Sequence, residues 1–160
     1  MSHPPDRACR DALAAFAELT LDRWHGLPPC TAADVVAALG PDGTAWQGPQ
    51  GRIVRYPGRV DRMTELEVHF QQDRAAHLIG FGPRLTPQDL LSLLGAPEAR
   101  APSRLLEPQN EQWIYATRGL TVHVDATTHA PGRIYGYPAM TVEQFEQSDL
   151  FFVETREEPR

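Results

Sequence analysis

The chain has 160 residues, of which 41% are hydrophobic and 22% are charged, and its formal net charge is −6 at pH 7. This length suits one ordinary domain or two fused half-domains, and such a chain needs neither a metal nor a disulfide to fold. The acidic balance argues against a general nucleic-acid binder, which needs a basic face to displace counterions from phosphates. No apolar run approaches the roughly 20 residues of a membrane span, so neither nucleic acid nor a membrane is an expected partner.

The first predicted element is an N-terminal helix that Asp6 caps and that continues to about Leu19. Its apolar residues recur at helical spacing and are Cys9, Ala12, Leu13, Phe16 and Leu19. Because Cys9 lies on this apolar stripe, it is expected to be a buried structural thiol. The two cysteines, Cys9 and Cys30, are neither a C-x-x-C pair nor a disulfide framework. The segment before this helix lacks the features of a secretory signal, so the expected location is the cytoplasm.

Two short helices are predicted where a similar sequence occurs twice, about 55 residues apart. Thr31–Gly40 reads TAADVVAALG, and Thr86–Gly95 reads TPQDLLSLLG. Each begins with Thr, a good N-cap, and has Asp at the third helical position, where the carboxylate can complete a capping box. Each ends in Leu-Gly, and glycine can adopt the positive φ that often terminates a helix.

Three strand candidates follow each helix in the same order, because their apolar and polar residues alternate. The first set is Ile53–Tyr56, Leu66–Phe70 and Ala76–Phe81, and the second is Trp113–Tyr115, Leu120–Val124 and Gly132–Tyr137. The segments between each helix and its first strand, Pro41–Gln50 and Ala96–Glu111, are expected to be long loops. The first of these loops holds Trp46.

These landmarks predict an α+β protein built from two tandem units, each a helix, a loop and three antiparallel strands. The units span residues 27–83 and 84–140 and form one continuous or paired sheet, while residues 1–26 supply the extra N-terminal helix and a linker. Residues 141–160 are expected to hold a short helix that begins at Thr141 and a charged tail. Between them, Leu150–Val153 is expected to form a last strand or to pack on the core.

The second unit resembles a repeat of bacterial binding proteins. Its helix ends in Leu94-Gly95-Ala96-Pro97, after which come the Trp/Tyr strand Trp113–Tyr115 and the alternating strand Leu120–Val124. This pattern is similar to the repeat unit of the β-lactamase inhibitor protein and of the SmpA/OmlA outer-membrane lipoproteins, and two-unit bacterial immunity proteins have a similar outline. The resemblance covers about residues 20–140 and implies a protein that binds other proteins on a concave sheet. The chain lacks the lipidated N-terminal Cys and the disulfide loops of these relatives, which favours a cytoplasmic neutraliser.

No catalytic or cofactor motif is found in the sequence. It has no Gly-rich phosphate loop, Gly-x-Ser-x-Gly elbow or His-Glu-x-x-His helix, and its six histidines lack the short spacing of zinc ligands. Cys30, His25 and Asp22 are close in sequence, but a catalytic triad is defined by convergence in space. We therefore expect a protein that is not an enzyme and that holds neither a cofactor nor a metal.

One face of the predicted sheet carries the candidate binding residues. If Leu66, Val68 and Phe70 face the helices, Glu67 and His69 face the other way, as does His123 in the second unit. A structural or partner-contacting role is favoured for these imidazoles over a metal or acid–base role. Aromatic side chains dominate interface hot spots, although an aromatic residue in a strand is more often buried. The candidate partner-binding residues are Trp46, Tyr56, Glu67, His69, Trp113, Tyr115, His123, Tyr135 and Tyr137.

The sequence favours three functions in a definite order. The first is a non-catalytic protein-binding module, an immunity protein or inhibitor that neutralises a toxin or enzyme, acting as a monomer or within a hetero-complex. The second is a structural adaptor in a bacterial assembly. The third is a small-molecule-binding domain or a weak enzyme, with a pocket between the two sheets.

Overall fold

The computed structural model describes residues 7–59, 61–103 and 109–151, which form four α-helices and eight strands. The first half contains α1 (Arg7–Ala17), a 3₁₀ turn (Leu21–Arg23), α2 (Ala32–Leu39), β1 (Thr44–Gly48), β2 (Gly51–Pro57), β3 (Glu65–Gln71) and β4 (Arg74–Phe81). The second half contains α3 (Pro87–Leu94), β5 (Ala99–Ser103), β6 (Asn110–Tyr115), a 3₁₀ turn (Ala116–Arg118), β7 (Leu120–Asp125), β8 (Pro131–Gly136) and α4 (Val142–Glu146). No helix in the described ranges is long and apolar enough to cross a membrane.

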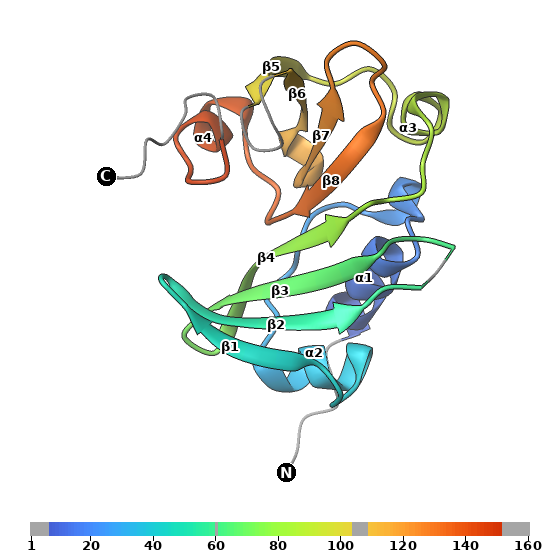
Figure 1. The fold of residues 1–160 in the computed structure, drawn as a ribbon. Helices are drawn as coiled ribbons and strands as arrows, with labels where there is room; N and C mark the ends of the chain where they lie inside the picture. The colour runs from blue at the N-terminus through green and yellow to red at the C-terminus, as the bar shows by residue number, and fades with distance from the viewer. Residues whose placement is uncertain (1–6, 60, 104–108, 152–160) are drawn as a thin grey trace, which may run out of the picture.

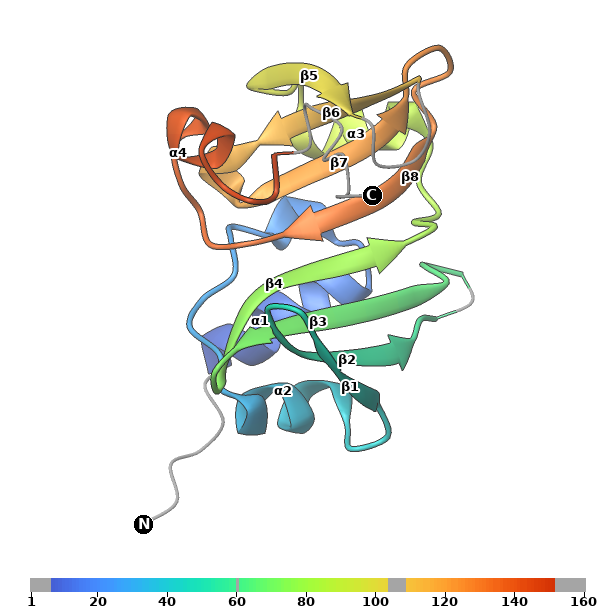
Figure 2. The same cartoon turned by 60° about the vertical axis from the view of Figure 1, so that its left-hand side comes forward.

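All eight strands belong to one antiparallel sheet in the order β1-β2-β3-β4-β8-β7-β6-β5 (Figure 1). Each half is a meander that begins at one edge of the sheet and ends at its centre, where β4 and β8 lie side by side (Figure 2). Their pairing runs from Leu78 opposite Gly136 to Phe81 opposite Arg133. The predicted α+β class with an antiparallel sheet is therefore confirmed, and the sheet is continuous.

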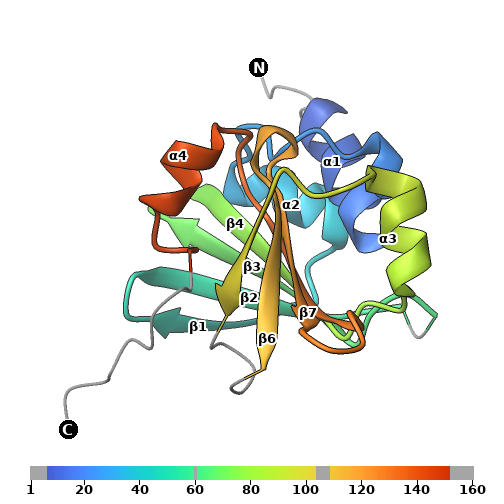
Figure 3. The same cartoon turned by 90° about the horizontal axis from the view of Figure 1, so that it is seen from above.

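The two faces of the sheet are covered by different helices. Helices α1, α2 and α3 pack on one face, where Val35 and Leu90 join Val122 of β7 in the main core. The other face carries α4, whose Phe145 joins Tyr137 in a smaller buried cluster. In the view from above, α4 lies apart from α1, α2 and α3 across the strands (Figure 3). We call the side that carries α4 the second face.

The structure corrects the predicted unit, because each half has four strands and not three. The expected loops Pro41–Gln50 and Ala96–Glu111 contain β1 and β5, which pair with β2 and β6 as the edge strands of the sheet. Strand β1 buries none of its residues, so it has no apolar alternation that a sequence pattern could reveal. Strand β5 includes Pro102, a residue that normally argues against a strand and is tolerated at a sheet edge.

The predicted N-terminal helix is confirmed as α1, although Asp6, its expected cap, lies outside the described residues. The structure overturns the expected thiol at Cys9, which forms a disulfide with Cys30. Both cysteines are fully buried, and the disulfide links α1 to the segment just before α2. The pairing depends on α1 packing beside α2, which the spacing of the two cysteines does not reveal.

Helices α2, α3 and α4 each begin with a complete capping box, at Thr31, Thr86 and Thr141. This confirms the three predicted helix starts. The glycines predicted to follow α2 and α3 have positive φ, 95° at Gly40 and 76° at Gly95. After α4, Leu150 and Phe151 pack against the smaller cluster, and the remainder of the expected C-terminal run lies outside the described residues.

Replacing Thr86 with Ala is expected to lower the free energy of unfolding by about 1 kcal/mol, the usual cost of losing an N-cap. The Thr86 hydroxyl accepts a hydrogen bond from the backbone N–H of Asp89 at 3.0 Å, and the Thr86 N–H donates to the Asp89 carboxylate at 2.9 Å. Urea unfolding measures the change. Ser92→Ala, on the same helix but away from the cap, serves as control, and a Thr86→Ala midpoint equal to that control would contradict the expectation.

Candidate functional site

A cluster of polar and aromatic side chains crosses the second face of the sheet. Glu67 and His69 lie there on β3, while Val68 and Phe70 belong to the main core on the opposite side. The predicted alternation of this strand is therefore confirmed. A register shift follows His69 and places it opposite His77 of β4.

Glu67 is a buried carboxylate, 5% exposed, that lies between two neighbouring side chains. Arg55 of β2 donates from Nε and Nη2 to Glu67 Oε2, with Nε at 2.9 Å, and this hydrogen bond raises the pKa of Arg55. On the other side, His69 Nε2 lies 2.9 Å from Glu67 Oε1. A carboxylate accepts only from an N–H, so a neutral His69 carries its proton on Nε2 and has Nδ1 as an acceptor. Glu67 thus fixes the orientation of His69.

Aromatic rings continue from His69 across the centre of the sheet. The His69 and His77 rings stack with centroids 4.4 Å apart, and His77 lies 6.3 Å from Tyr135 of β8. Tyr135 in turn lies 5.1 Å from His123 of β7, whose Nδ1 is 2.7 Å from the hydroxyl of Ser103 on β5. The two histidines singled out from the sequence, His69 and His123, therefore share a face, with His77 and Tyr135 between them.

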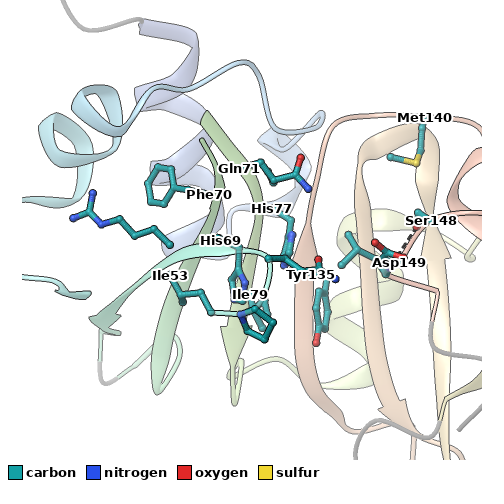
Figure 4. Close-up of a pocket in the computed structure, with 16 residues that line it drawn as sticks. Ile53, His69, Phe70, Gln71, His77, Ile79, Tyr135, Met140, Ser148 and Asp149 are labelled. Carbon is teal, nitrogen blue, oxygen red and sulfur yellow. Dashed lines mark hydrogen bonds between the residues drawn. The ribbon is translucent and has the colours of Figure 1, made fainter. Parts of the chain in front are cut away.

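A cavity of about 590 Å³ opens beside these rings (Figure 4). His69, His77 and Tyr135 line it from the sheet. The turn after β1 also lines it, as does the segment after α4, which includes the carboxylate of Asp149. Its apolar lining includes Ile53, Ile79, Met140 and Leu150. The volume and the mixture of apolar walls with a few polar groups are typical of a small-molecule site.

His77 is a polar group of the cavity for which the described part of the chain supplies no hydrogen-bond partner. Within the described ranges, neither of its ring nitrogens has a hydrogen bond. Burial, reinforced by the neighbouring His69, lowers the pKa of His77 to about 3. The ring is therefore neutral at pH 7 and offers one N–H donor and one acceptor nitrogen. A polar group that loses water is unfavourable unless a ligand or another water bonds to it, so His77 is one of the polar groups through which the cavity can recognise a ligand.

The structure places the nine candidate partner-binding residues in three environments. Those buried in the main core against α1, α2 and α3 are Tyr56, Trp113 and Tyr115. Those buried on the second face are Glu67, His123, Tyr135 and Tyr137. Trp46 is 39% exposed and His69 is half-buried. The four tyrosines and Trp113 are therefore buried and form no exposed aromatic patch, because one face of the sheet is core and α4 packs on the other.

Three of these aromatic side chains also have internal hydrogen bonds. Tyr115 donates its hydroxyl to the carbonyl of Gly95 at 3.0 Å, and burial raises its pKa to about 12. Tyr137 donates to the carbonyl of Leu120 at 3.1 Å, and burial raises its pKa as well. Trp113 donates its indole N–H to a carboxylate oxygen of Glu111 at 2.7 Å. These contacts give the three residues structural roles.

Sequence reasoning missed several residues that define the cavity. His77 lies on a predicted strand and alternates with Ile79, so its face could have been assigned from parity. Its position opposite His69 could not, because the register shift after His69 sets it. Met140 and Leu150 carry no pattern that points to a pocket, since they reach it only through the way α4 packs on the sheet.

Acidification is expected to destabilise the fold through His77 and His123. Burial lowers the pKa of each to about 3, with His69 and Arg133 respectively adding to the effect, from an ordinary value of 6.5. At pH values between about 3 and 6.5, these two histidines bind more protons in the unfolded chain than in the folded one. Stability therefore falls as pH falls through this window, by at most about 1.4 kcal/mol per pH unit for each histidine.

Urea unfolding between pH 7 and pH 4 measures this slope. His77→Gln removes one of the two titrating groups, so its free energy of unfolding should depend less steeply on pH than that of the unaltered chain. Carboxylates contribute equally in both proteins and cancel in the difference. Identical slopes would show that His77 is not held neutral.

Among residues 7–59, 61–103 and 109–151, no group of three or more His, Cys, Asp or Glu side chains is arranged to hold a metal ion.

No protein-family model and no curated protein matches the sequence. Among solved structures, the chain is similar to the crystal structure of a DUF4309 family protein, YjgB, from Bacillus subtilis. The TM-score is 0.50 at 14% sequence identity, and the match covers 82% of this chain and 99% of that chain. At this identity the likeness concerns the fold alone, which the two chains share over most of their lengths.

Proposed function

We propose that the chain is a non-catalytic binding protein whose cavity on the second face holds a small molecule. The observation that carries this proposal is His77, a neutral imidazole that lines a cavity of about 590 Å³ and has no hydrogen-bond partner among the described residues. Apolar walls with a few convergent polar groups are the usual composition of ligand sites. A bound molecule would satisfy His77 and cover Ile53, Ile79 and Leu150.

Among the described residues that line the cavity, no serine or cysteine is arranged as an activated nucleophile, which supports binding over catalysis. Both cysteines are in the disulfide. The hydroxyl of Ser148, which lines the cavity, donates to the carbonyl of Phe145 at 2.7 Å and accepts from the N–H of Leu150 at 3.3 Å. His69 is oriented by Glu67, but covalent catalysis also requires a nucleophile within hydrogen-bond reach of such a base.

Thermal unfolding with a small panel of naphthalene compounds tests the proposal, because a ligand that binds only the folded state raises Tm. We expect 2-naphthol to raise Tm in a concentration-dependent way. Ile53→Trp fills the cavity from β2 and should abolish the shift. Val36→Trp, at a position of α2 that is 45% exposed, should preserve it. If no compound in the panel raises Tm, or if Tm rises equally in the unaltered chain and in both variants, the cavity is not a ligand site.

A second candidate function, binding of a partner polypeptide, is favoured by the edge strand β1. Its sequence, Thr-Ala-Trp-Gln-Gly, has no charge and no proline, whereas the opposite edge β5 contains Arg100 and Pro102. Charged residues and proline are the usual protection of an edge against a further strand. Trp46 of β1 is exposed, and the Arg55 guanidinium lies 5.1 Å from its ring centroid. An immunity protein, inhibitor or adaptor could bind its partner at such an edge.

Co-purification from the native host tests this second candidate. A toxin-like or enzyme partner that binds at a one-to-one ratio should be lost with Trp46→Ala, because an exposed tryptophan is a common hot spot. Val36→Ala is the matched control, since Val36 is another exposed apolar residue. A partner that survives Trp46→Ala would place its binding elsewhere on the molecule.

We also infer that the two halves are tandem copies of one unit, as the sequence predicts. Each runs helix, edge strand and three further strands, and each helix begins with a Thr–Asp capping box. The strand irregularities support the inference too, because a register shift follows His69 in the first half and His123 in the second. These histidines occupy matching positions in the sequence repeat.

The disulfide bears on where the protein acts. Structural disulfides persist in oxidising compartments and are rare in the cytosol. The Cys9–Cys30 bond therefore favours an oxidising compartment over the cytoplasm that the sequence suggested.

A further inference from the structure

We propose that the edge strand β1 pairs with β1 of a second copy of the chain, so that two molecules share one continuous antiparallel sheet. This inference rests on the second candidate function, polypeptide binding at this edge, and names the polypeptide. It does not depend on the ligand cavity. Three features of β1 carry it: the backbone groups that point outward, the way these groups match their own copies under two-fold symmetry, and the charges nearby.

Strand β1 is the outermost strand of its half of the sheet, beside β2 (Figure 1). Backbone hydrogen bonds of an antiparallel strand alternate between its two neighbours. Just after β2, the N–H of Gly58 donates to the carbonyl of Thr64, so even-numbered residues of β2 bond toward β3 and odd-numbered ones toward β1. Trp46 pairs with an odd-numbered residue of β2 and therefore bonds to it. The N–H and C=O groups of Ala45 and Gln47 consequently point outward, where no described strand pairs with them.

Two-fold pairing about Trp46 satisfies these outward groups with their own copies. In an antiparallel pair centred on Trp46, Ala45 lies opposite Gln47 of the second copy, and the symmetry repeats this pair. Each outward N–H then faces a C=O, as in the hydrogen-bonded type of pair. A register centred on Gln47 would instead place Ala45 opposite Pro49, which has no N–H. A register centred on Ala45 would pair Gln47 with Gly43, which lies outside the strand.

The proposed register also brings the two Trp46 side chains together. The guanidinium of Arg55, which bonds to Glu67 on the second face, lies 5.1 Å from the centroid of the Trp46 ring, so the indole lies on that face too. Trp46 is 39% exposed in the single chain. At the two-fold axis it would form a non-hydrogen-bonded pair with its own copy, the arrangement in which opposite side chains are closest. Each indole would then bury aromatic surface that water now contacts.

The charges near β1 allow two copies to approach. The strand itself has no charged residue. Arg55 forms ion pairs with Glu65 and Glu67. Arg52, which pairs with Gln47 in the sheet, would be three strand spacings from its own copy, or about 14 Å. This separation exceeds the Debye length of about 8 Å at physiological ionic strength, so repulsion between the two guanidinium groups is largely screened.

Sedimentation velocity of the full chain, from micromolar to millimolar concentration, tests the pairing. We expect a reversible change from the mass of one chain to twice that mass. Ala45→Lys with Gln47→Lys places like charges opposite each other at both symmetric pairs and should raise the dissociation constant at least about tenfold. The matched variant, Ala45→Lys with Gln47→Glu, alters the same positions but places opposite charges together. It should keep the dissociation constant of the unaltered chain or lower it.

Amide exchange of the unaltered chain provides a second measurement that needs no variant. The N–H groups of Ala45 and Gln47 should exchange more slowly as the protein concentration rises. The N–H of Trp46 is already bonded to β2 and serves as the internal control, because its exchange should not change. If Ala45 and Gln47 exchange at the same rate in the single chain and in the dimer, β1 is not the strand that pairs.

The outcomes separate this inference from the second candidate function. The mass of one chain at every concentration would show that β1 does not pair with its own copy. A partner that co-purifies and is lost with Trp46→Ala would in that case still support polypeptide binding at this edge. If a dimer forms and both charge variants have equal dissociation constants, the copies associate through another surface and the proposal is wrong.

Discussion

Replacing Trp24 with Ala is expected to lower the free energy of unfolding by about 3–5 kcal/mol, the largest effect of any single substitution considered for this chain. Trp24 is fully buried between the 3₁₀ turn and the sheet, with its ring centroid 5.3 Å from that of Phe16. Its indole N–H donates to the carbonyl of Gly119 at 3.1 Å, across 95 residues of sequence. The substitution would leave a cavity and an unpaired carbonyl together.

The position of Trp24 explains the size of the effect. A Cβ added at Gly136 would lie 2.9 Å from a Trp24 ring atom, so the indole packs directly on the backbone of β8. Gly136 pairs with Leu78 on one side and Leu120 on the other, at the junction of the two halves. Trp24 thus joins the N-terminal segment to the centre of the sheet, and its loss should weaken both halves in one cooperative transition.

Urea unfolding monitored by circular dichroism measures this change. Trp24→Phe is the matched control, because it keeps a large ring and removes the indole N–H. It should cost less than Trp24→Ala. If Trp24→Ala lowers the free energy of unfolding by less than about 1 kcal/mol, neighbouring side chains fill the space that the indole leaves. Trp24 would then not be needed to join the N-terminal segment to the sheet.

Removing the Cys9–Cys30 disulfide is expected to lower the free energy of unfolding by about 3 kcal/mol. The bond joins residues 21 positions apart in the chain, and closing a loop of that length restricts the unfolded chain substantially. In the folded state the bond holds α1 beside α2, so its loss should also increase amide exchange in α1.

The double variant Cys9→Ser/Cys30→Ser and the unaltered chain are compared with and without a thiol reductant. Reduction should lower the urea midpoint of the unaltered chain toward that of the double variant, which should not respond. Both cysteines are fully buried, so reduction requires opening of the fold and should be slow under native conditions. Equal midpoints for the oxidised chain and the double variant would show that the bond adds no stability.

The helices and most strands could be predicted because their signals are local. The capping boxes at Thr31 and Thr86 and the alternation of Leu66–Phe70 depend on a few neighbouring residues, and the structure shows the expected elements at those positions. The edge strands β1 and β5 could not, because β1 buries no residue and β5 contains Pro102. Their strand conformation comes from pairing with β2 and β6.

The candidate site was harder to predict, because tertiary packing decides which side chains are exposed. Parity correctly placed Glu67 and His69 on one face, but it could not show that α4 packs there or that Tyr137 is buried beneath it. The Cys9–Cys30 bond likewise depends on how α1 and α2 pack. The resemblance to the β-lactamase inhibitor protein and the role in neutralising a toxin stay predictions.

The most direct test of the central claim, a ligand cavity beside His77, is a titration of isotope-labelled protein with 2-naphthol followed by amide and imidazole NMR shifts. We predict that shifts concentrate at the cavity lining, with His77, Ile79 and Leu150 among the largest, and that the His77 ring resonances move with the same dissociation constant. Saturable shifts centred elsewhere, or none up to the solubility limit of 2-naphthol, would contradict the claim.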